Sequence, residues 1–532
     1  MKKKYVLFTP LLVFSIALNA CANNGKRIEE VSFDEQTFGD YDGYYRHDIS
    51  EYNLTEYPQC GVFGAYTDPS RLPTPSMGTV NVLVVPVYFE DSDTFSKEDL
   101  KVLDRVYNAN SKDTGWESLH SFYYKSSYGK LDFEATVVEP YNVGIETAAF
   151  RNWENYSPTG KLAYKITKWL INDKGMNLKK FDSNDDGYID CLQMIYKYNE
   201  KTGDGDTFWA YTSMASASAA ASATSNKKLP YKPEIYFWSR YSMIENDYYD
   251  INIDAHTLTH ETGHALGLND YYDYDRNKGD APAGMCDMMD LNIGDHSAFS
   301  KMLLGWTSPY YVDGSKNEVT ITLNSFAETG DFILLKDNWN GTPYDEYLTL
   351  SYFTPDLNNK QDSEMGYPEW QWDRGEYGVG GLYKKAGLAL HHVDNRQIAY
   401  RQNYFGYARD INDLKYSYST AHSNTQSQSV NVEETVKQWD WVTGSPYKQF
   451  ALIAADKSNT LNENYAFWHL GDQNFLFSTP EYGGGASSFN IADYSHLFAE
   501  ETKFDDGEDI AWSFEILEQN DDNITVKLIK NA

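Results

Sequence analysis

The 532-residue chain carries 78 acidic and 45 basic side chains, a formal net charge of −33, and 41% of its residues are hydrophobic. This length exceeds that of one ordinary domain and the apolar share can fill real cores, so we expect two globular units. Such an acidic surface repels phosphates, which excludes nucleic acid and anionic lipid as main partners, and it is compatible with calcium binding.

Residues 1–21 predict an export signal, because three lysines precede an apolar stretch that is too short to span a bilayer and that ends in small residues. Residues 18–21 read LNAC and resemble a bacterial lipobox, in which Cys21 is lipidated. The alternative is an ordinary signal peptide cut near Ala20 or Ala22. Two acyl chains suffice for anchoring, so we expect a lipoprotein at the outer face of the cell membrane, or a form released from it.

Three other cysteines, Cys60, Cys191 and Cys286, permit at most one disulfide, and their spacing does not suggest a cysteine zinc site. The polar, tyrosine-rich residues 22–77 are expected to be a tether or a short prosegment. Secondary structure is then predicted as a buried strand over Val80–Phe89, a helix capped by Ser96, a helix over 160–173, a strand over 191–198, an Ala/Ser loop over 213–226 and a helix from His256.

Beyond about Thr307 the sequence changes to short alternating segments separated by Gly, Asn and Asp. These segments read EVTITL, DFILLK, EYLTLSYF, GLALHHV, FALIAA and ITVKLIK. That pattern is typical of a β-sandwich or jelly roll. The predicted class is therefore α+β, with a mixed sheet and a motif helix in a domain over 78–310 and a mostly β domain over 311–532.

The helix predicted from His256 contains the pattern H-E-x-x-H at residues 260–264. Residues four apart lie on one helix face, so His260 and His264 can reach one Zn²⁺ while Glu261 lies beside the water that the metal activates. The alternative is a capped amphipathic helix that carries surface histidines.

The pattern continues through Gly267 to Asp270, which is the layout of metzincin peptidases with aspartate in the third ligand position. A glycine here can end the helix sharply, so that Asp270 turns back towards the metal and a fourth position stays open for water. Acids near Asp287 and Asp290 are alternative third ligands.

Three methionines, Met285, Met288 and Met289, follow in residues 284–306. Metzincins place a methionine on a tight turn beneath the zinc, and we expect Met289, rather than Met288, to be this Met-turn residue. Methionines in such a stretch are otherwise ordinary core residues.

Several segments together resemble the immune inhibitor A family of secreted bacterial metalloproteases, particularly its lipoprotein-like members. They span roughly residues 78–400 in the family's order and read VNVLVVPVYFED, SFYYKSSYGKLDF, FDSNDDGYIDCLQMIY, HETGHALGLNDYYDY, CDMMDLNIGDHSAFSKMLLGW and GLALHHVDNR. The resemblance implies a zinc endopeptidase with a metzincin-like catalytic domain and β-rich C-terminal domains. It also implies His260 and His264 as ligands and Glu261 as general base. Long prosegments are common in that family, whereas the stretch before Val80 is short.

A second metal site is predicted where oxygen-bearing side chains recur as in the first half of an EF-hand loop. The side chains are Asp182, Asn184, Asp186 and Asp190, with Gly187 at position 6 of the loop. Position 12 is Gln193 rather than glutamate, so a true EF-hand is not expected, and the alternative is an Asx-rich turn before a strand. The acidic residues 270–280 are a weaker calcium candidate.

Four other histidines have predicted places. His256 lies on the same helix face as His260 and is expected to pack near the site without touching zinc. His296 is either a transition-state donor or part of a helix-capping segment. His391 and His392 lie in a predicted strand, where a structural role is expected.

The expected function is that of a monomeric zinc endopeptidase, in which Glu261 takes a proton from water and delivers it to the leaving amine of a protein or peptide substrate. No organic cofactor is expected. One alternative is a surface-anchored binding lipoprotein for glycans or host proteins, with an incidental metal site. Another is a structural lipoprotein stabilised by calcium.

Overall fold

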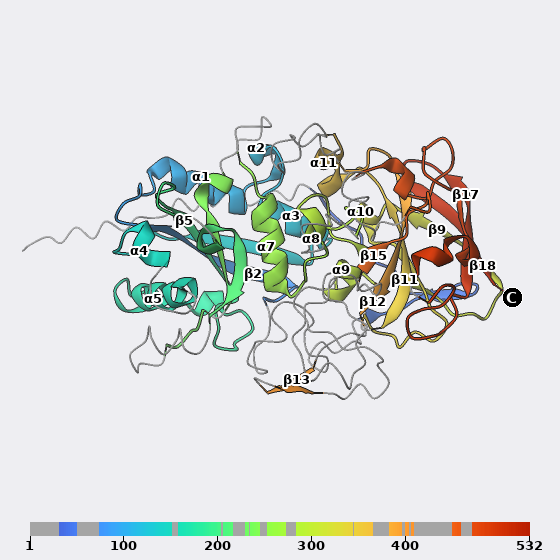
Figure 1. Cartoon of the computed structure of the whole chain (residues 1–532), viewed down its shortest axis with the longest axis horizontal. Helices are drawn as coiled ribbons and strands as arrows, with labels where there is room; N and C mark the ends of the chain where they lie inside the picture. The colour runs from blue at the N-terminus through green and yellow to red at the C-terminus, as the bar shows by residue number, and fades with distance from the viewer. Residues whose placement is uncertain are drawn as a thin grey trace, which may run out of the picture. The chain divides into compact units, whose positions relative to one another are not determined.

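The computed structural model in Figure 1 combines helices with several β-sheets, which confirms the α+β class. Contacts group Phe33–Ala532 as one compact unit, distinct from Met1–Ser32, and every element named below belongs to the larger unit. The structure describes residues 31–49, 74–151, 158–203, 206–215, 229–233, 235–244, 253–272, 283–343, 345–364, 382–395, 400–403, 406–408, 450–458, 471–498 and 500–531.

The first sheet has the strand order β3-β2-β5-β7-β6, and β4 also pairs with β2. All of these pairings are parallel except that of β6, which runs antiparallel to β7 at one edge. The strands are β2 (Gly78–Tyr88), β3 (Leu131–Val137), β4 (Tyr141–Asn142), β5 (Cys191–Lys197), β6 (Tyr211–Met214) and β7 (Ile235–Arg240).

Strand β2 confirms the predicted buried strand, and its composition follows from burial on both faces. Val82 and Val84 share a core with α1 and α3, whereas Leu83 and Val85 share another core with α5. A strand covered on both sides needs apolar residues throughout rather than in alternation. The helices of this half are α1 (Lys97–Asn108), α2 (Ser111–Thr114), α3 (Leu119–Ser126), α4 (Thr147–Arg151), α5 (Pro158–Asn172) and α7 (His256–Leu266).

Helix α1 begins where the sequence predicts. Ser96 accepts a hydrogen bond from the Asp99 amide, and the Asp99 carboxylate accepts one from the Ser96 amide, which together form a capping box. The predicted helix over 160–173 is confirmed as α5, and the predicted strand over 191–198 as β5.

The second sheet has the order β1-β8-β10-β11-β12-β15. Every residue of β11 and β12 is buried, because Tyr347 and Val393 face the core of α3 and α7 while Leu348 and Leu390 face a third sheet. The strands are β1 (Tyr44–Arg46), β8 (Tyr310–Val312), β10 (Phe332–Leu335), β11 (Glu346–Phe353), β12 (Gly387–Asp394) and β15 (Phe450–Leu452).

The third sheet is antiparallel, with the order β16-β17-β18-β9, and shares a hydrophobic core with the second sheet. Strand β9 alternates strictly between exposed and buried residues, so only one of its faces is covered. These strands are β9 (Glu318–Asn324), β16 (Ser488–Phe489), β17 (Trp512–Gln519) and β18 (Asn523–Lys530). Each of the six predicted late strands is confirmed, and β8, β16 and β17 are additional strands of these two sheets.

Shorter elements complete the described parts. A two-stranded ribbon joins β13 (Tyr400–Asn403) to β14 (Gly406–Ala408). Short helices are α8 (Met288–Leu291), α9 (Ala298–Leu303), α10 (Phe326–Thr329), α11 (Lys360–Glu364) and α14 (Ile491–Tyr494). Turns of 3₁₀ helix are η2 (Lys179–Phe181), η3 (Asp206–Phe208), η4 (Tyr241–Met243), η5 (Leu357–Asn359), η7 (Gln473–Phe475) and η8 (Ser495–Leu497).

The segment predicted as a tether or prosegment contributes to the fold. Its strand β1 pairs with β8, and Arg46 forms a buried ion pair of 2.5 Å with Asp331. Gln36 also donates a hydrogen bond of 2.9 Å to the Thr307 hydroxyl. Residues 33–49 therefore pack against β8 and the residues on either side of it.

Candidate metal centre

Helix α7 carries the H-E-x-x-H residues and ends at Gly267, as predicted. Gly267 has φ +106°, a left-handed conformation that L side chains rarely adopt, and its amide bonds back to the carbonyls of Gly263 and His264. The chain then reverses direction. Asp270 consequently returns to the helix face that His260 and His264 share.

The side chains of His260, His264 and Asp270 converge in the structure, with one ligand atom from each lying within 4.8 Å of the other two. Asp270 Oδ1 lies 2.8 Å from His260 Nε2 and 3.2 Å from His264 Nε2. All three residues are buried. Two imidazoles and a carboxylate are a donor set that zinc uses in peptidases.

The other ring nitrogen of each histidine is held by a backbone carbonyl. His260 Nδ1 lies 3.0 Å from the Met288 oxygen, and His264 Nδ1 lies 2.9 Å from the Leu268 oxygen. A carbonyl accepts a hydrogen bond, so each Nδ1 carries the proton and each Nε2 faces Asp270 as the atom that can bind a metal.

The pKa shifts of Asp270 and His264 follow from the contact between the carboxylate and the two imidazoles. Burial alone would raise the pKa of the Asp270 carboxyl, but His264 and His260 hold it well below its usual range. Burial would likewise lower the pKa of His264, yet the Asp270 carboxylate raises it to about 9. His264 and Asp270 thus form a buried pair whose pKa values are shifted in opposite directions, and shifted pKa values are common at functional sites.

Glu261 lies beside this group with an unused acceptor. Its residue is 8% exposed, and its Oε2 atom has no hydrogen-bond partner among the described residues. Burial raises the pKa of Glu261, while His264 and His260 act to lower it. A buried carboxylate oxygen without a partner is costly, so its presence here fits a site that receives a metal ion and water.

The edge strand β6 is tied to the same helix. The Thr212 hydroxyl donates a hydrogen bond of 2.7 Å to the Glu261 carbonyl. Strand β6 pairs with β7 along one side and forms the end of the sheet order in the described parts of the chain. An edge strand therefore runs beside the candidate metal centre.

Met289 lies against the helix between the two histidines. A Cβ atom added to Gly263 would collide with the Met289 sulfur, so the methionine fills the space that a side chain at this position would need. Met288 contributes its carbonyl to His260 instead. Met285, at φ +61°, adopts the left-handed backbone of a tight turn.

The two alternative third ligands have other partners. Asp287 accepts hydrogen bonds from the Met289 amide and the Ser300 hydroxyl and contacts His296. Asp290 accepts one from the Met285 amide, and burial raises its pKa to about 8. Neither belongs to the donor group around Asp270.

The predicted calcium loop closes through hydrogen bonds of its own. Asp182 accepts from the amides of Asp186 and Gly187, while Asp190 accepts from the Ser183 amide and hydroxyl. Burial raises the pKa of Asp190 to about 6. Among the described residues, the carboxylates of this loop do not form a group of three ligand atoms within 4.8 Å of one another, and its hydrogen bonds are those of an Asx-rich turn. Calcium binding by the loop stays a prediction.

His256 lies apart from the donor group, as predicted. It bridges Asp254 at 2.7 Å and Asp362 at 3.1 Å, and its ring stacks on Trp116. Burial would lower the pKa of His256, but the two carboxylates raise it to about 10.

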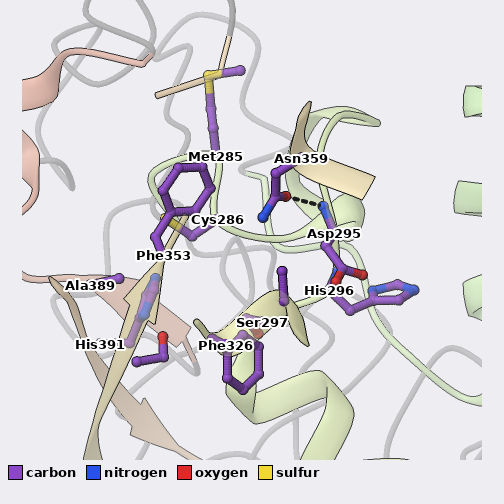
Figure 2. A pocket seen from close by; sticks show the side chains of 12 residues that line it. Met285, Cys286, Asp295, His296, Ser297, Phe326, Phe353, Asn359, Ala389 and His391 are labelled. Atoms are coloured by element: carbon purple, nitrogen blue, oxygen red, sulfur yellow. Dashed lines mark hydrogen bonds between the residues drawn. The ribbon is translucent and has the colours of Figure 1, made fainter. Parts of the chain in front are cut away.

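His296 is fully buried among aromatic rings, and Ser297 after it caps α9. His391 stacks on Phe450, and burial lowers its pKa to about 4. The cavity in Figure 2 is lined by both histidines and by Cys286, and not by the three donor residues. Cys191 and Cys286 are free thiols, while Cys60, the lipobox Cys21 and acidic residues 273–280 lie outside the described residues.

The side-chain contacts of Gln193 are a finding that the sequence does not predict. The Gln193 side chain accepts a hydrogen bond of 2.6 Å from Tyr107 and donates one of 2.9 Å to Thr262 on α7. All three residues are buried. The one signal in the sequence is a glutamine inside the apolar run CLQMIY, which marks a polar group that needs buried partners.

No protein-family model matches the chain, and a search of curated proteins finds no match. The resemblance to the immune inhibitor A family accordingly rests on the sequence motifs. In the described parts of the chain, no helix is both long and apolar enough to cross a membrane.

Proposed function

We propose that this chain is a zinc endopeptidase whose metal ligands are His260, His264 and Asp270. The observation that carries the proposal is the convergence of these three donors at the turn after α7, with the free Glu261 oxygen beside them. A chance helix with two histidines would need neither the returning aspartate nor the two Nδ1 hydrogen bonds to carbonyls.

When bound, zinc supplies Lewis acidity, which lowers the pKa of water and polarises a carbonyl group. Glu261 takes the proton of the attacking water on Oε2 and delivers it to the leaving amine. Its raised pKa suits a group that must both accept and donate a proton near neutral pH. In this proposal the three donor residues hold the zinc ion beside Glu261.

Strand β6 supports a peptide substrate in particular. An extended peptide can add to the edge of a sheet through main-chain hydrogen bonds, and β6 is joined to Glu261 through Thr212. A peptide aligned along this edge would pass close to the proposed zinc. The substrate class is therefore peptide bonds in proteins.

The fold assignment and location belong to the same proposal. Residues 78–310 are proposed as a metzincin-type catalytic domain with Met289 as the Met-turn residue, followed by a β-sandwich domain over 311–532. The chain is proposed to be a monomeric lipoprotein, exported and anchored through Cys21, and residues 182–190 to bind calcium.

One assay tests the proposal. Protein lacking residues 1–21 is incubated with casein and with a mixed peptide library, with and without 1,10-phenanthroline. We expect cleavage that the chelator abolishes and that added zinc restores. Absence of cleavage by zinc-loaded, folded protein, or cleavage indifferent to the chelator, would contradict the proposal.

A further inference from the structure

We propose that Glu346, His392 and Asp505 form a second site for a divalent cation, of the zinc class, between strands of the second sheet and the loop before β17. Their ligand atoms lie within 4.8 Å of one another, and among the described residues only this group and the one at α7 have that arrangement. The inference does not depend on the peptidase activity.

Two of the donors are placed by strand register. His392 in β12 lies opposite Leu348 in β11, so Glu346, two residues from Leu348, is its diagonal neighbour on the same sheet face. His392 Nε2 lies 2.8 Å from Glu346 Oε1, the same separation as between His260 Nε2 and Asp270 Oδ1. Figure 1 shows the two strands side by side.

The third donor comes from a distant part of the chain, and the backbone around it orients Glu346. The amides of Asp505 and Asp506 donate hydrogen bonds of 2.5 and 3.0 Å to the two oxygens of Glu346. Such hydrogen bonds to a carboxylate fix its orientation, as they do around metal ligands. The loop itself is held by an ion pair between Lys336 and Asp506.

The three donor residues are buried. Glu346 is 0% exposed, Asp505 1% and His392 7%. The rings of Phe498 and Phe504 lie 5.3 and 6.0 Å from the His392 ring and form an apolar wall. An apolar wall excludes water and strengthens the attraction between a cation and its ligands.

Formal charge also favours a cation. Two carboxylates and a protonated histidine carry a charge of −1, whereas two carboxylates, a neutral histidine and a dication are neutral. Burying net charge is costly, so the neutral arrangement suits the 0% exposure of Glu346 better. Imidazole is a zinc ligand, whereas calcium prefers six to eight oxygens, and this identifies the class of ion.

Such a cation would cross-link three separate segments of the chain. Glu346 begins β11, His392 lies in β12, and Asp505 precedes β17 of the third sheet. A structural zinc at this place would fasten the second sheet to the segment that enters the third. Its role would be stability rather than catalysis.

Zinc stoichiometry tests the site. Protein lacking residues 1–21 is stripped with chelator, reloaded with Zn²⁺, dialysed and measured by mass spectrometry. We expect about two zinc ions per chain in the wild type and about one in either His264→Ala or His392→Gln. Asp509→Asn is the matched control, because that exposed carboxylate lies in the same loop but pairs with Lys503, away from the three donors, and it should keep both ions.

The outcomes separate the two proposed sites. If the wild type holds one zinc ion and His264→Ala loses it, then Glu346, His392 and Asp505 form only a hydrogen-bonded cluster without a metal. This result overturns the second site. Two ions that persist in folded His392→Gln overturn it as well. If the wild type holds one zinc ion, which His264→Ala keeps and His392→Gln loses, the result supports the second site and contradicts the first.

Folding of the variants is checked by circular dichroism. If His392→Gln does not fold, Asp505→Asn gives the same readout with a smaller change of shape. If neither folds, His264→Ala decides: about one remaining ion supports the site, and none overturns it.

Discussion

Asp270 is the residue that joins the candidate metal centre, because one of its oxygens contacts both His260 and His264. We expect Asp270→Ala to lose zinc affinity as well as activity. Asp270→His should recover part of both, since imidazole occupies this corner in the commoner metzincin pattern. Competition with a chromophoric chelator measures the affinity of each variant.

Asp290→Asn is the matched control for this experiment. It replaces a buried carboxyl group close to Asp270, and this group accepts a hydrogen bond from the Met285 amide rather than facing the histidines. It should therefore keep near wild-type zinc affinity. If Asp270→Ala bound zinc as tightly as this control, the third ligand would lie elsewhere. A loss of zinc affinity of only about 10–100-fold would mean that Asp270 orients a ligand rather than binding the metal itself.

Gly263 tests the place of Met289 beneath the helix. Gly263→Ala would drive a methyl group into the Met289 sulfur, and overpacking of this kind costs about 1–3 kcal/mol. We expect a lower free energy of unfolding in urea. Met289→Ala should then cost less in the Gly263→Ala background than in the wild type, because it removes the collision. Strictly additive effects would mean that the two residues do not touch.

At the residue scale, the sequence predicted the residues that come together at α7 but not the ones that hold the helix in place. His260, His264 and Asp270 follow from spacing and a glycine turn, which are local properties. Gln193 and Thr212 reach the helix from strands far away in the chain. The sequence pattern assigns Gln193 to position 12 of a calcium loop, whereas in the structure its partners are Tyr107 and Thr262.

At the scale of elements, the loop over 182–190 gives a calcium prediction. Asp182→Ala and Asp186→Ala should lower the melting temperature in calcium buffer and remove most of the stabilisation that calcium provides, because a ligand that binds only the folded state stabilises it by mass action. The measured quantity is the shift between calcium and chelator, since Asp182 also holds the turn through backbone amides.

Asp185→Asn is the control variant of this loop. Asp185 has φ +61°, which asparagine tolerates, and its exposed carboxylate pairs with Lys179 instead of facing inward. It should keep the full calcium shift. Equal shifts in Asp182→Ala, Asp185→Asn and the wild type would remove the case for calcium and leave an Asx-rich turn.

Elements with strong periodicity were predicted well, and those without it were not. Strand β2 and helix α1 have long apolar patterns and a capping box that act locally. Strand β1 has three residues and forms only because β8, more than 260 residues later, offers an edge. The antiparallel direction of β6 likewise depends on its partner β7, so no local pattern encodes it.

At the scale of the whole molecule, His256 joins distant parts around the candidate centre. One carboxylate partner, Asp254, precedes α7, and the other, Asp362, lies in α11. Asp362 also accepts a hydrogen bond of 2.7 Å from the Gly294 amide. Helix α7, the loop at Gly294 and α11 are therefore fastened by one buried cluster.

This cluster predicts a pH dependence of stability. The pKa of His256 is raised from 6.5 to about 10 in the folded state, so its contribution is full below pH 6.5 and is lost as the pH rises towards 10. We expect the difference in unfolding free energy between the wild type and His256→Gln to shrink from about pH 6 to pH 10. A difference that stays constant over this range would show that His256 is not charged in the folded protein.

We propose that Glu261 carries protons in a zinc-dependent cleavage of peptide bonds, and the Glu261→Gln variant is the sharpest test of this role. The amide keeps the shape of the side chain but cannot accept a proton from water. Zinc content and peptidase rate are measured on the same preparation. We predict wild-type zinc content with a rate lowered by about 100-fold or more. A variant that keeps both its zinc and most of the wild-type rate would show that Glu261 is not the general base.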